Sequence, residues 1–327
     1  MTAIRIGIVG YGNLGRGVEI AISLQEDMEL VGVFTRREPA SVSTVNGQTP
    51  VHPMDALEAM QDEIDVLVLC GGSKSDLPEQ TPQLAKRFTV VDSFDTHARI
   101  PEHFANVDAV AREAGTTAII STGWDPGLFS INRVYGEAIL PAGSTYTFWG
   151  RGLSQGHSDA LRRIDGVAGA VQYTIPSQDA IDRVRAGERP ELSSREKHTR
   201  ECFVVLEEGA DAEAVRHEIV TMPHYFEPFE TTVTFLSADE LARDHRSMPH
   251  GGFVIRSAES SPGTTQTIEY RLQEDSNPEF TASVVVAYAR AAARLAAAGE
   301  HGAKTPFDIA PGLLSPKSAE QLRAELL

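Results

Sequence analysis

Apolar and polar residues alternate in blocks along the first third of the chain. Short apolar runs with β-branched residues occur at 4–9, 30–34, 64–70, 89–92 and 117–121. Segments with helical periodicity lie between them, at 18–24, 54–60, 77–87 and 100–114. Strands that alternate with helices predict a doubly wound parallel sheet, the Rossmann arrangement of α/β proteins. The polar, proline-containing stretch 41–53 is expected to be a loop.

The pattern changes after Pro126, where segments with strand character follow one another without regular helices between them. These segments lie at 145–149, 171–175, 202–206, 231–236, 252–257 and 264–272. Helices are expected at 178–185, 212–220 and 239–244, and later at 280–298 and 317–326. This order predicts a second, α+β domain on a mixed sheet. We expect a first domain at 1–122, completed by 296–327, and a second domain at 123–295.

Composition and charge narrow the classes of function. The chain has 327 residues, 41% of them hydrophobic, and a formal net charge of -17. Nucleic acids and anionic membranes favour basic surfaces, so neither is an expected partner. Cys70 and Cys202 provide neither a disulfide framework nor a metal-ligand spacing, and no metal is expected. No signal peptide and no apolar run of membrane-spanning length is apparent, so we expect a cytoplasmic protein.

A glycine-rich turn follows the first strand: Gly10, Tyr11, Gly12, Asn13, Leu14 and Gly15. This spacing between a strand and a helix is the fingerprint of dinucleotide binding. Gly10 permits the tight turn, Gly12 allows a pyrophosphate to approach the backbone, and Gly15 allows close packing of helix on strand. The helix N-terminus then faces the phosphates with free N–H groups.

The end of the second strand indicates which dinucleotide is bound. NAD-binding proteins place an acidic residue there, which accepts a hydrogen bond from the ribose 2′-hydroxyl. Here the residues are Thr35, Arg36 and Arg37. Guanidinium groups suit a 2′-phosphate because they are always charged and offer forked donors. The position favours NADP, although the same residues are also compatible with a solvated basic turn.

Ligands of such sheets bind beyond the carboxyl ends of the strands. The further candidates at these ends are Cys70, Gly71, Gly72, Ser73, Ser93, Phe94, Asp95, Ser121, Thr122, Gly123, Trp124 and Asp125. Asp95 and Asp125 have carboxylates that can hold a substrate ammonium or transfer a proton. Helix or loop capping is an equally reasonable role for each of them.

Candidates in the second domain are less specific. Gly152 to Gly156 matches the Gly-x-Ser-x-Gly elbow of hydrolases, with His157 and Asp159 nearby. A hydrolase elbow follows a parallel strand and has distant triad partners, so a polar substrate loop is the better hypothesis. Arg200 can clamp a carboxylate, but by itself a solvated strand end is the better explanation of this residue. His250 lies in a glycine-rich loop, and by itself a structural role is the better explanation of this residue.

Taken together, the motifs resemble the meso-diaminopimelate dehydrogenase family. They span nearly the whole chain, and the longest is the most specific. They are 10–16, 121–127, 129–133, 147–163, 248–252 and 277–283. The resemblance implies a Rossmann domain and a second domain for substrate binding and dimerisation. It also implies a cytoplasmic homodimer of lysine biosynthesis that uses NADP. The reaction would be oxidative deamination of the D-centre of meso-2,6-diaminopimelate to L-2-amino-6-oxopimelate and ammonia.

The resemblance also assigns roles to individual residues. Tyr11 to Leu14 would contact the pyrophosphate, and Thr35 to Arg37 the 2′-phosphate. Asp95 and Asp125 match the family's substrate carboxylates, and Asp125 is the expected partner in proton transfer. The substrate pocket and the group that fixes the distal L-amino-acid end would comprise Trp149, Gln155, Gly156, Thr174, Arg200, His250 and Asn277. Two alternatives remain: another NADP-dependent oxidoreductase of this architecture, and a non-enzymatic NADP sensor.

Overall fold

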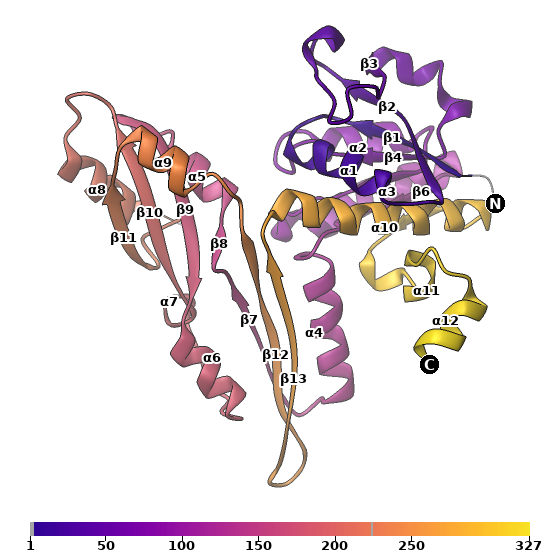
Figure 1. Cartoon of the computed structure of the whole chain (residues 1–327). Coiled ribbons are helices and arrows are strands. Elements are labelled where there is room, and N and C mark those ends of the chain that lie inside the picture. The colour runs from indigo at the N-terminus through magenta and orange to yellow at the C-terminus, as the bar shows by residue number, and fades with distance from the viewer. Residues whose placement is uncertain (1–2, 224) are drawn as a thin grey trace. The chain divides into compact units, whose positions relative to one another are not determined.

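The chain folds into two compact units (Figure 1). The computed structural model describes residues 3–223 and 225–327. One unit comprises Met1–Ile131 and Pro278–Leu327, and the other comprises Asn132–Asn277. The expected boundaries at 122/123 and 295/296 differ from these. The later one is displaced most, because the helix that starts at Asn277 packs its apolar face into the first unit.

The first unit is built on a seven-stranded parallel sheet of order β14-β6-β5-β4-β1-β2-β3. This confirms the predicted doubly wound sheet. Pairing of β1 with both β2 and β4 places the glycine-rich turn in the interior of the carboxyl edge. The strands are β1 (Ile4–Val9), β2 (Met28–Thr35), β3 (Val51–Pro53), β4 (Val66–Leu69), β5 (Val90–Asp92), β6 (Thr117–Ile119) and β14 (Gly302–Lys304).

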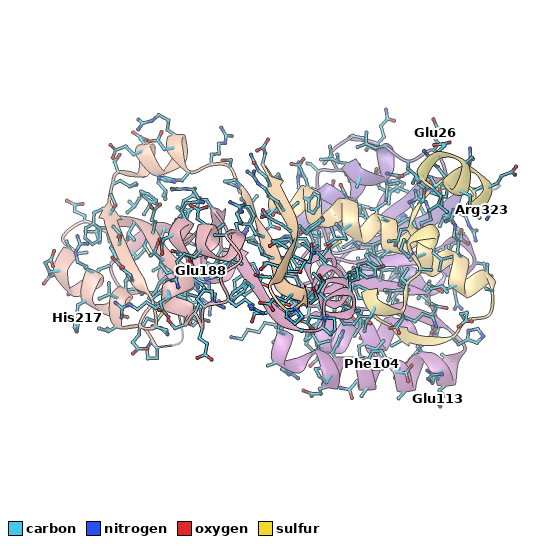
Figure 2. The ribbon with its side chains drawn as sticks, turned by 90° about the horizontal axis from the view of Figure 1, so that it is seen from below. Glu26, Phe104, Glu113, Glu188, His217 and Arg323 are labelled. Atoms are coloured by element: carbon cyan, nitrogen blue, oxygen red, sulfur yellow. The ribbon has the colours of Figure 1, made fainter. Side chains whose placement is uncertain are left out.

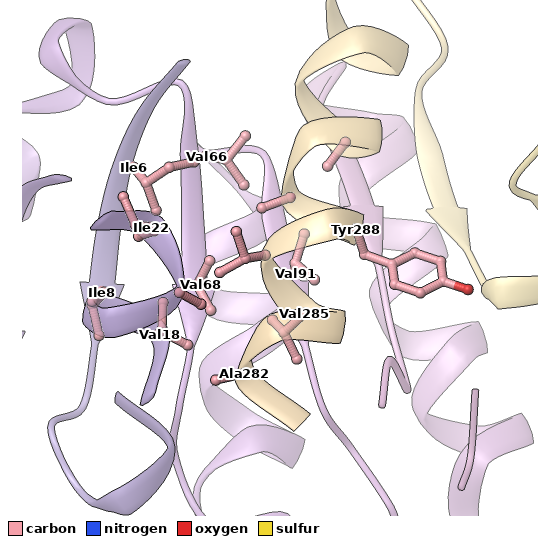
Figure 3. Packing of buried hydrophobic residues seen from close by; sticks show 14 of the residues in the cluster. Ile6, Ile8, Val18, Ile22, Val66, Val68, Val91, Ala282, Val285 and Tyr288 are labelled. Carbon is pink, nitrogen blue, oxygen red and sulfur yellow. The ribbon is translucent and has the colours of Figure 1, made fainter. Parts of the chain in front are cut away.

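Helices cover both faces of this sheet, because alternate strand residues point to opposite sides. On one face Ile6, Ile8 and Val68 pack against α1 (Asn13–Ser23) and α10 (Asn277–Ala297), as Figure 3 shows. On the other face Leu67 and Val90 pack against α2 (Leu77–Ala85) and α3 (Ile100–Ala114). The chain ends with α11 (Pro311–Leu314) and α12 (Ala319–Leu326).

One expectation about membranes needs correction. By length and composition α10 could cross a membrane, whereas the sequence was expected to hold no such run. Half of its apolar window is buried inside the structure, and Ala282, Val285 and Tyr288 belong to the core of the first unit (Figure 3). Its hydrophobicity is therefore explained by packing against the sheet. Buried Arg290 adds a bidentate pair with Asp27, at 2.6 and 2.7 Å.

The second unit contains two sheets. A four-stranded sheet has the order β11-β10-β9-β8, parallel only between β10 and β11, and a three-stranded antiparallel sheet has the order β13-β12-β7. The predicted mixed α+β unit is thus confirmed. Its strands are β7 (Gly143–Trp149), β8 (Gly152–Leu153), β9 (Val167–Pro176), β10 (His198–Leu206), β11 (Glu230–Phe235), β12 (His250–Ser261) and β13 (Thr264–Glu274).

Each of these sheets has its own apolar core. Ala170 and Val204 of the larger sheet pack with α5 (Gln155–Leu161) and α8 (Ala212–Thr221). Phe148 and Ile255 of the smaller sheet pack with α6 (Gln178–Arg185). Outer faces of these helices are polar, as exposed His217 of α8 illustrates in Figure 2. The remaining helices are α7 (Ser194–Lys197) and α9 (Ala238–Asp244).

Several elements differ from expectation. The predicted loop 41–53 contains the edge strand β3, and β14 forms the opposite edge of the parallel sheet. Both have only three residues, and neither lies in an apolar run that would indicate a strand. Helix α4 (Leu128–Ile139) was not expected after Pro126 and Gly127. The helix at 54–60 is a 3-10 helix, Met54–Glu58.

Candidate functional site

The glycine-rich turn has the geometry that its sequence predicts. Gly10 has φ of 87°, in the region that glycine adopts without strain. A Cβ on Gly15 would lie 2.4 Å from the carbonyl oxygen of Gly10, so the helix could not pack as closely with any larger residue. A Cβ on Gly12 would meet nothing within 4 Å. The turn therefore leaves open space in front of the N-terminus of α1, and the positive end of a helix dipole attracts phosphate.

The two arginines at the end of β2 are held differently. The backbone N–H of Arg37 donates to Oγ1 of buried Thr35 at 3.1 Å. Its Nη2 donates to the carbonyl oxygen of Tyr11 at 2.6 Å. Arg37 thus joins the end of β2 to the glycine-rich turn. The positive charges expected to bind a 2′-phosphate stand beside the expected site of the pyrophosphate.

Arg36 has a carboxylate partner that was not predicted from the sequence. Its Nη2 lies 2.8 Å from Oδ1 of Asp76, and Oδ2 of Asp76 accepts from the N–H of Gly72, also at 2.8 Å. Asp76 therefore joins the loop after β4 to the end of β2. Both side chains line a cavity of about 710 Å³ between the Met54–Glu58 helix and α2. No sequence spacing indicated this contact, which depends on how the two loops fold.

The loops after β4 and β5 are also joined. Oγ of Ser73 accepts from the backbone N–H of Asp95 at 2.8 Å and lies 3.2 Å from Oγ1 of Thr96. Asp95 itself is exposed. The predicted residues at these strand ends thus form one continuous edge with the glycine-rich turn.

Asp92 fixes the two loops that carry the predicted catalytic carboxylates. Its fully buried side chain accepts from the N–H groups of Phe94 and Ser121, at 3.0 and 2.8 Å. Its other oxygen binds Thr81 at 2.8 Å and Nε2 of His103 at 2.7 Å. A buried carboxylate is stable only when it is satisfied in this way. Asp92 was predicted only as the last residue of a strand, without a role, although an acidic residue that ends a buried strand is a usable signal.

Trp124 and Asp125 follow in the loop after β6. Trp124 is buried, and its ring meets that of Phe129 edge-on at a centroid distance of 5.1 Å. An isolated bridge joins Trp124 to Gly127 and closes the loop on itself. Asp125 is half-buried at the tip of this closed loop. The predicted candidates of the first unit therefore all lie along the carboxyl edge of its sheet.

In the second unit, Arg200 and Thr174 meet on one face of the larger sheet. They are opposite residues of β10 and β9, and Nη1 of Arg200 donates to Oγ1 of Thr174. The guanidinium lies over the ring of Phe229, with Cζ 3.9 Å from its centroid. Arg200 is only 8% exposed. The pairing of these two residues confirms that the strand end is not a solvated one.

The charge of Arg200 is not balanced by an acidic side chain within the described residues. Burial lowers the pKa of its guanidinium to about 10, and no carboxylate opposes that shift. Burial, and then the charge of Arg200, lower the pKa of His157 to about 4. Burial and then the charge of Arg200 are also the main causes that lower the pKa of His198 to about 3. Near neutral pH these imidazoles are uncharged, and the region has an excess of positive potential that would attract an anion.

His250 and Trp149 lie beside this arginine. The ring of His250 fills the space above Gly152, where a Cβ would come within 2.3 Å of it, and Gly152 is the β8 residue opposite Thr174. The N–H of Trp149 donates to Nε2 of His198 at 2.9 Å, and their rings stack at 5.3 Å. Burial, countered in part by a bond with Gly251, lowers the pKa of His250 to about 4.

The remaining predicted residues gather around Met248. Nε2 of Gln155 lies 3.6 Å from its sulfur, and the N–H of Asn277 donates to its carbonyl oxygen at 2.9 Å. Gly156 follows Gln155 in the first turn of α5, and a Cβ there would meet nothing within 4 Å. The structure thus brings the predicted residues into two groups, one in each unit.

The hydrolase alternative is not supported by the geometry. Ser154 is the N-cap of α5: its Oγ accepts from the N–H of His157 and lies 2.7 Å from its Nδ1. Asp159 is paired with Arg162. Ser154 follows the short antiparallel strand β8, whereas a nucleophile elbow requires a parallel strand. Residues 3–223 and 225–327 also contain no group of three or more potential metal ligands.

The fold and the two groups define a class of protein. A parallel sheet with a dinucleotide turn and two arginines after β2, in a chain whose second unit contains a buried arginine, is the construction of a dinucleotide-dependent dehydrogenase. The sequence model described as "Diaminopimelic acid dehydrogenase C-terminal domain" matches residues 123–276. The chain belongs to the meso-diaminopimelate D-dehydrogenase family, whose member from Lysinibacillus sphaericus is 65% identical over 100% of both chains.

Solved structures agree with this assignment. The Corynebacterium glutamicum DAP dehydrogenase in complex with DAP is 48% identical, covers 100% of both chains and superposes with a TM-score of 0.93. An engineered D-amino acid dehydrogenase bound to NADP+ is 46% identical, covers 100% of both chains and gives a TM-score of 0.88. The resemblance inferred from the motifs is therefore confirmed, and the protein is an oxidoreductase.

Proposed function

We propose that this protein catalyses the reversible, NADP-dependent oxidative deamination of the D-centre of meso-2,6-diaminopimelate. The products are L-2-amino-6-oxopimelate, ammonia and NADPH, and the reverse reductive amination would serve lysine biosynthesis. The family, the DAP complex of one relative and the NADP+ complex of another support this choice. The residue roles below rest on the position of each residue in the family's motifs and on its surroundings in this chain.

One observation carries the proposal: Arg200 is buried and lacks an acidic partner among the described residues. Burying a charge without a counter-ion is costly, so such an arginine is typical of a site for an anionic ligand. Thr174 and His250 offer further polar groups beside it. We assign this cluster to the carboxylate of the distal L-centre, with Trp149, Gln155, Gly156 and Asn277 around the same molecule.

The first unit fits NADP. The open space in front of Gly12 and the N-terminus of α1 suit a pyrophosphate, and Thr35, Arg36 and Arg37 suit a 2′-phosphate. When bound, NADP accepts the hydride from the D-configured carbon. The chain's own task is to hold that carbon at reacting distance, which anchoring of the far L-end achieves.

Asp95 and Asp125 complete the site in this proposal. Both carboxylates lie at the carboxyl edge of the first sheet, one exposed and one half-buried. They would bind the ammonium of the D-centre, which must lose a proton before the amine can become an imine. Asp125 is the partner assigned to that proton transfer. Asp125→Asn with an unchanged deamination rate and normal KM would remove this role.

Absorbance of NADPH provides the direct test. Purified protein and NADP are mixed with meso-, LL- or DD-diaminopimelate in separate cuvettes. Reduction with the meso isomer alone, and none when NAD replaces NADP, is the expected result. Bound NADPH without turnover of any isomer would instead support the NADP sensor. Turnover of another acid would support a different oxidoreductase of the same architecture.

We also propose a cytoplasmic homodimer, with no membrane or nucleic-acid partner. Val134, Tyr135 and Ile139 of α4 expose 48%, 51% and 65% of their surface, an apolar set that a second copy would cover. Sedimentation equilibrium should give twice the chain mass of 35.4 kDa. A single-chain mass across the concentration range would contradict the dimer.

A further inference from the structure

Gln172 of β9 is an anomaly in the core of the second unit. Its side chain is 0% exposed, yet neither Oε1 nor Nε2 has a hydrogen-bond partner within residues 3–223 and 225–327. An amide buried without partners costs free energy that an apolar residue of the same shape would not. Its neighbours on the same strand face include Ala170 and, two residues further on, Thr174. A polar side chain at this position therefore needs a functional explanation.

The nearest explanation lies on the adjoining strand. Nε of Arg200 is also buried without a partner in the described part of the chain, although Nη1 is bound to Thr174. Arg200 is opposite Thr174, and Cys202 is opposite Gln172. Opposite residues of an antiparallel pair share a face, so Gln172 and Arg200 are diagonal neighbours. Diagonal neighbours lie within reach of long side chains.

We propose that Gln172 is a positioning residue for Arg200: its Oε1 accepts the Nε–H of the guanidinium when a substrate carboxylate occupies the Nη edge. This inference deepens the proposed function and rests on it. A guanidinium can bind a carboxylate through either of two edges. An internal acceptor for Nε, together with Thr174 on Nη1, would leave one orientation for the ligand.

A neutral amide is the residue type that this task requires. A carboxylate in the same place would neutralise Arg200 permanently and compete with the substrate. An apolar residue would leave Nε without a partner in the complex and allow the guanidinium to turn. Gln172 thus lowers the stability of the free enzyme, and in the complex it fixes the orientation of the Arg200 guanidinium.

Two variants of the full chain test this role, assayed for KM and kcat with meso-diaminopimelate and for thermal stability. Gln172→Met preserves volume and should raise KM for diaminopimelate about tenfold or more, because a hydrogen bond to a charged group is lost. KM for NADP should not change, and the melting temperature should stay equal or rise. Gln172→Glu should raise KM further and also raise the melting temperature, because Arg200 gains a buried counter-ion.

Ser257→Ala is the matched control. Oγ of Ser257 is likewise fully buried without a partner in the described residues, but it lies on β12 of the other sheet. Its removal should leave KM unchanged. An unchanged KM in Gln172→Met, or a lower melting temperature in both variants, would show that Gln172 serves packing and would overturn the inference. Absence of turnover in the unaltered protein would instead refute the proposed function.

Discussion

Glu274 provides the sharpest test of the structure that does not depend on any ligand. It is the last residue of β13, only 6% exposed, and neither carboxylate oxygen has a partner within residues 3–223 and 225–327. Burial raises the pKa of this carboxyl from 4.5 to about 7. The protonated form is therefore favoured in the folded protein at pH values where the unfolded chain is already ionised.

The sign of the pH effect follows from this raised pKa. Below pH 4.5 both states are protonated and Glu274 has no effect on the free energy of unfolding. Between pH 4.5 and about 7 the unfolded state releases its proton first, so stability falls as pH rises. Above that window the full loss is reached: the raised pKa of Glu274 lowers the free energy of unfolding by about 3 kcal/mol. The cost at pH 5 is about 1 kcal/mol.

Glu274→Gln keeps the shape and removes the titration. Relative to the unaltered protein, the variant should gain about 2.5 kcal/mol between pH 5 and pH 8.5. For a domain of this size, the melting temperature of the variant minus that of the unaltered protein should be about 5–10 °C larger at pH 8.5 than at pH 5. Any constant cost of burying the amide cancels, because only the change with pH is compared.

The assay is thermal or urea unfolding of both proteins at the two pH values, followed by far-UV circular dichroism. Glu208→Gln, which alters an exposed carboxyl of the same unit, is the control and should show no such pH dependence. A stability difference for Glu274→Gln that is the same at both pH values would refute the reasoning. It would mean that the carboxylate is solvated or paired in the folded state.

Three further predictions concern the first unit. Arg37→Ala should weaken NADP binding about 10- to 100-fold and leave NAD binding unchanged, measured by fluorescence titration, because a charged donor is lost; equal losses for both cofactors would contradict its phosphate role. Asp92→Asn should lower stability by about 2–4 kcal/mol in denaturant unfolding, since one fully buried carboxylate satisfies two N–H groups, a hydroxyl and His103; an unchanged midpoint would argue against this network. Arg290→Met should lower the free energy of unfolding by about 3 kcal/mol, because Asp27 loses its partner. The loss should be smaller near pH 3, since Arg290 holds the pKa of Asp27 below its usual value. A loss independent of pH would contradict that pairing.

Much of the fold could be predicted because its buried strands lie in apolar runs and several of its helices show a clear apolar periodicity. Residues 100–114 and 178–185 were predicted as helices and are helices with those bounds, α3 and α6. Gly10 has the positive φ that its position in the motif required. The short strands β3 and β14 escaped prediction because pairing with a neighbour, not local sequence, makes them strands. The same holds for the return of the chain at Pro278, which depends on packing of α10.

The candidate site was predictable to a different degree in each unit. In the first unit the sheet topology itself brings the strand ends together, so residues such as Asp95 could be named from the strand pattern alone. In the second unit no general rule connects Trp149 with Arg200, and only the family resemblance suggested that they act together. The supporting residues Asp76, Asp92 and Gln172 were missed in both units, because a hydrogen-bond partner from another loop or strand leaves no periodic signal.

Buried polar residues distinguish the functional face of the larger sheet from an ordinary core. Ala170 and Val204 pack like any sheet interior, yet the same face continues into Gln172, Thr174 and Arg200. Apolar residues at these three positions would bury the same surface at lower cost. These three polar residues therefore lower the stability of the free protein at the place where a bound ligand carboxylate can restore it. Stability and substrate binding should therefore move in opposite directions at Gln172 and Arg200, whereas in the apolar part of the sheet a loss of stability should leave substrate binding unchanged.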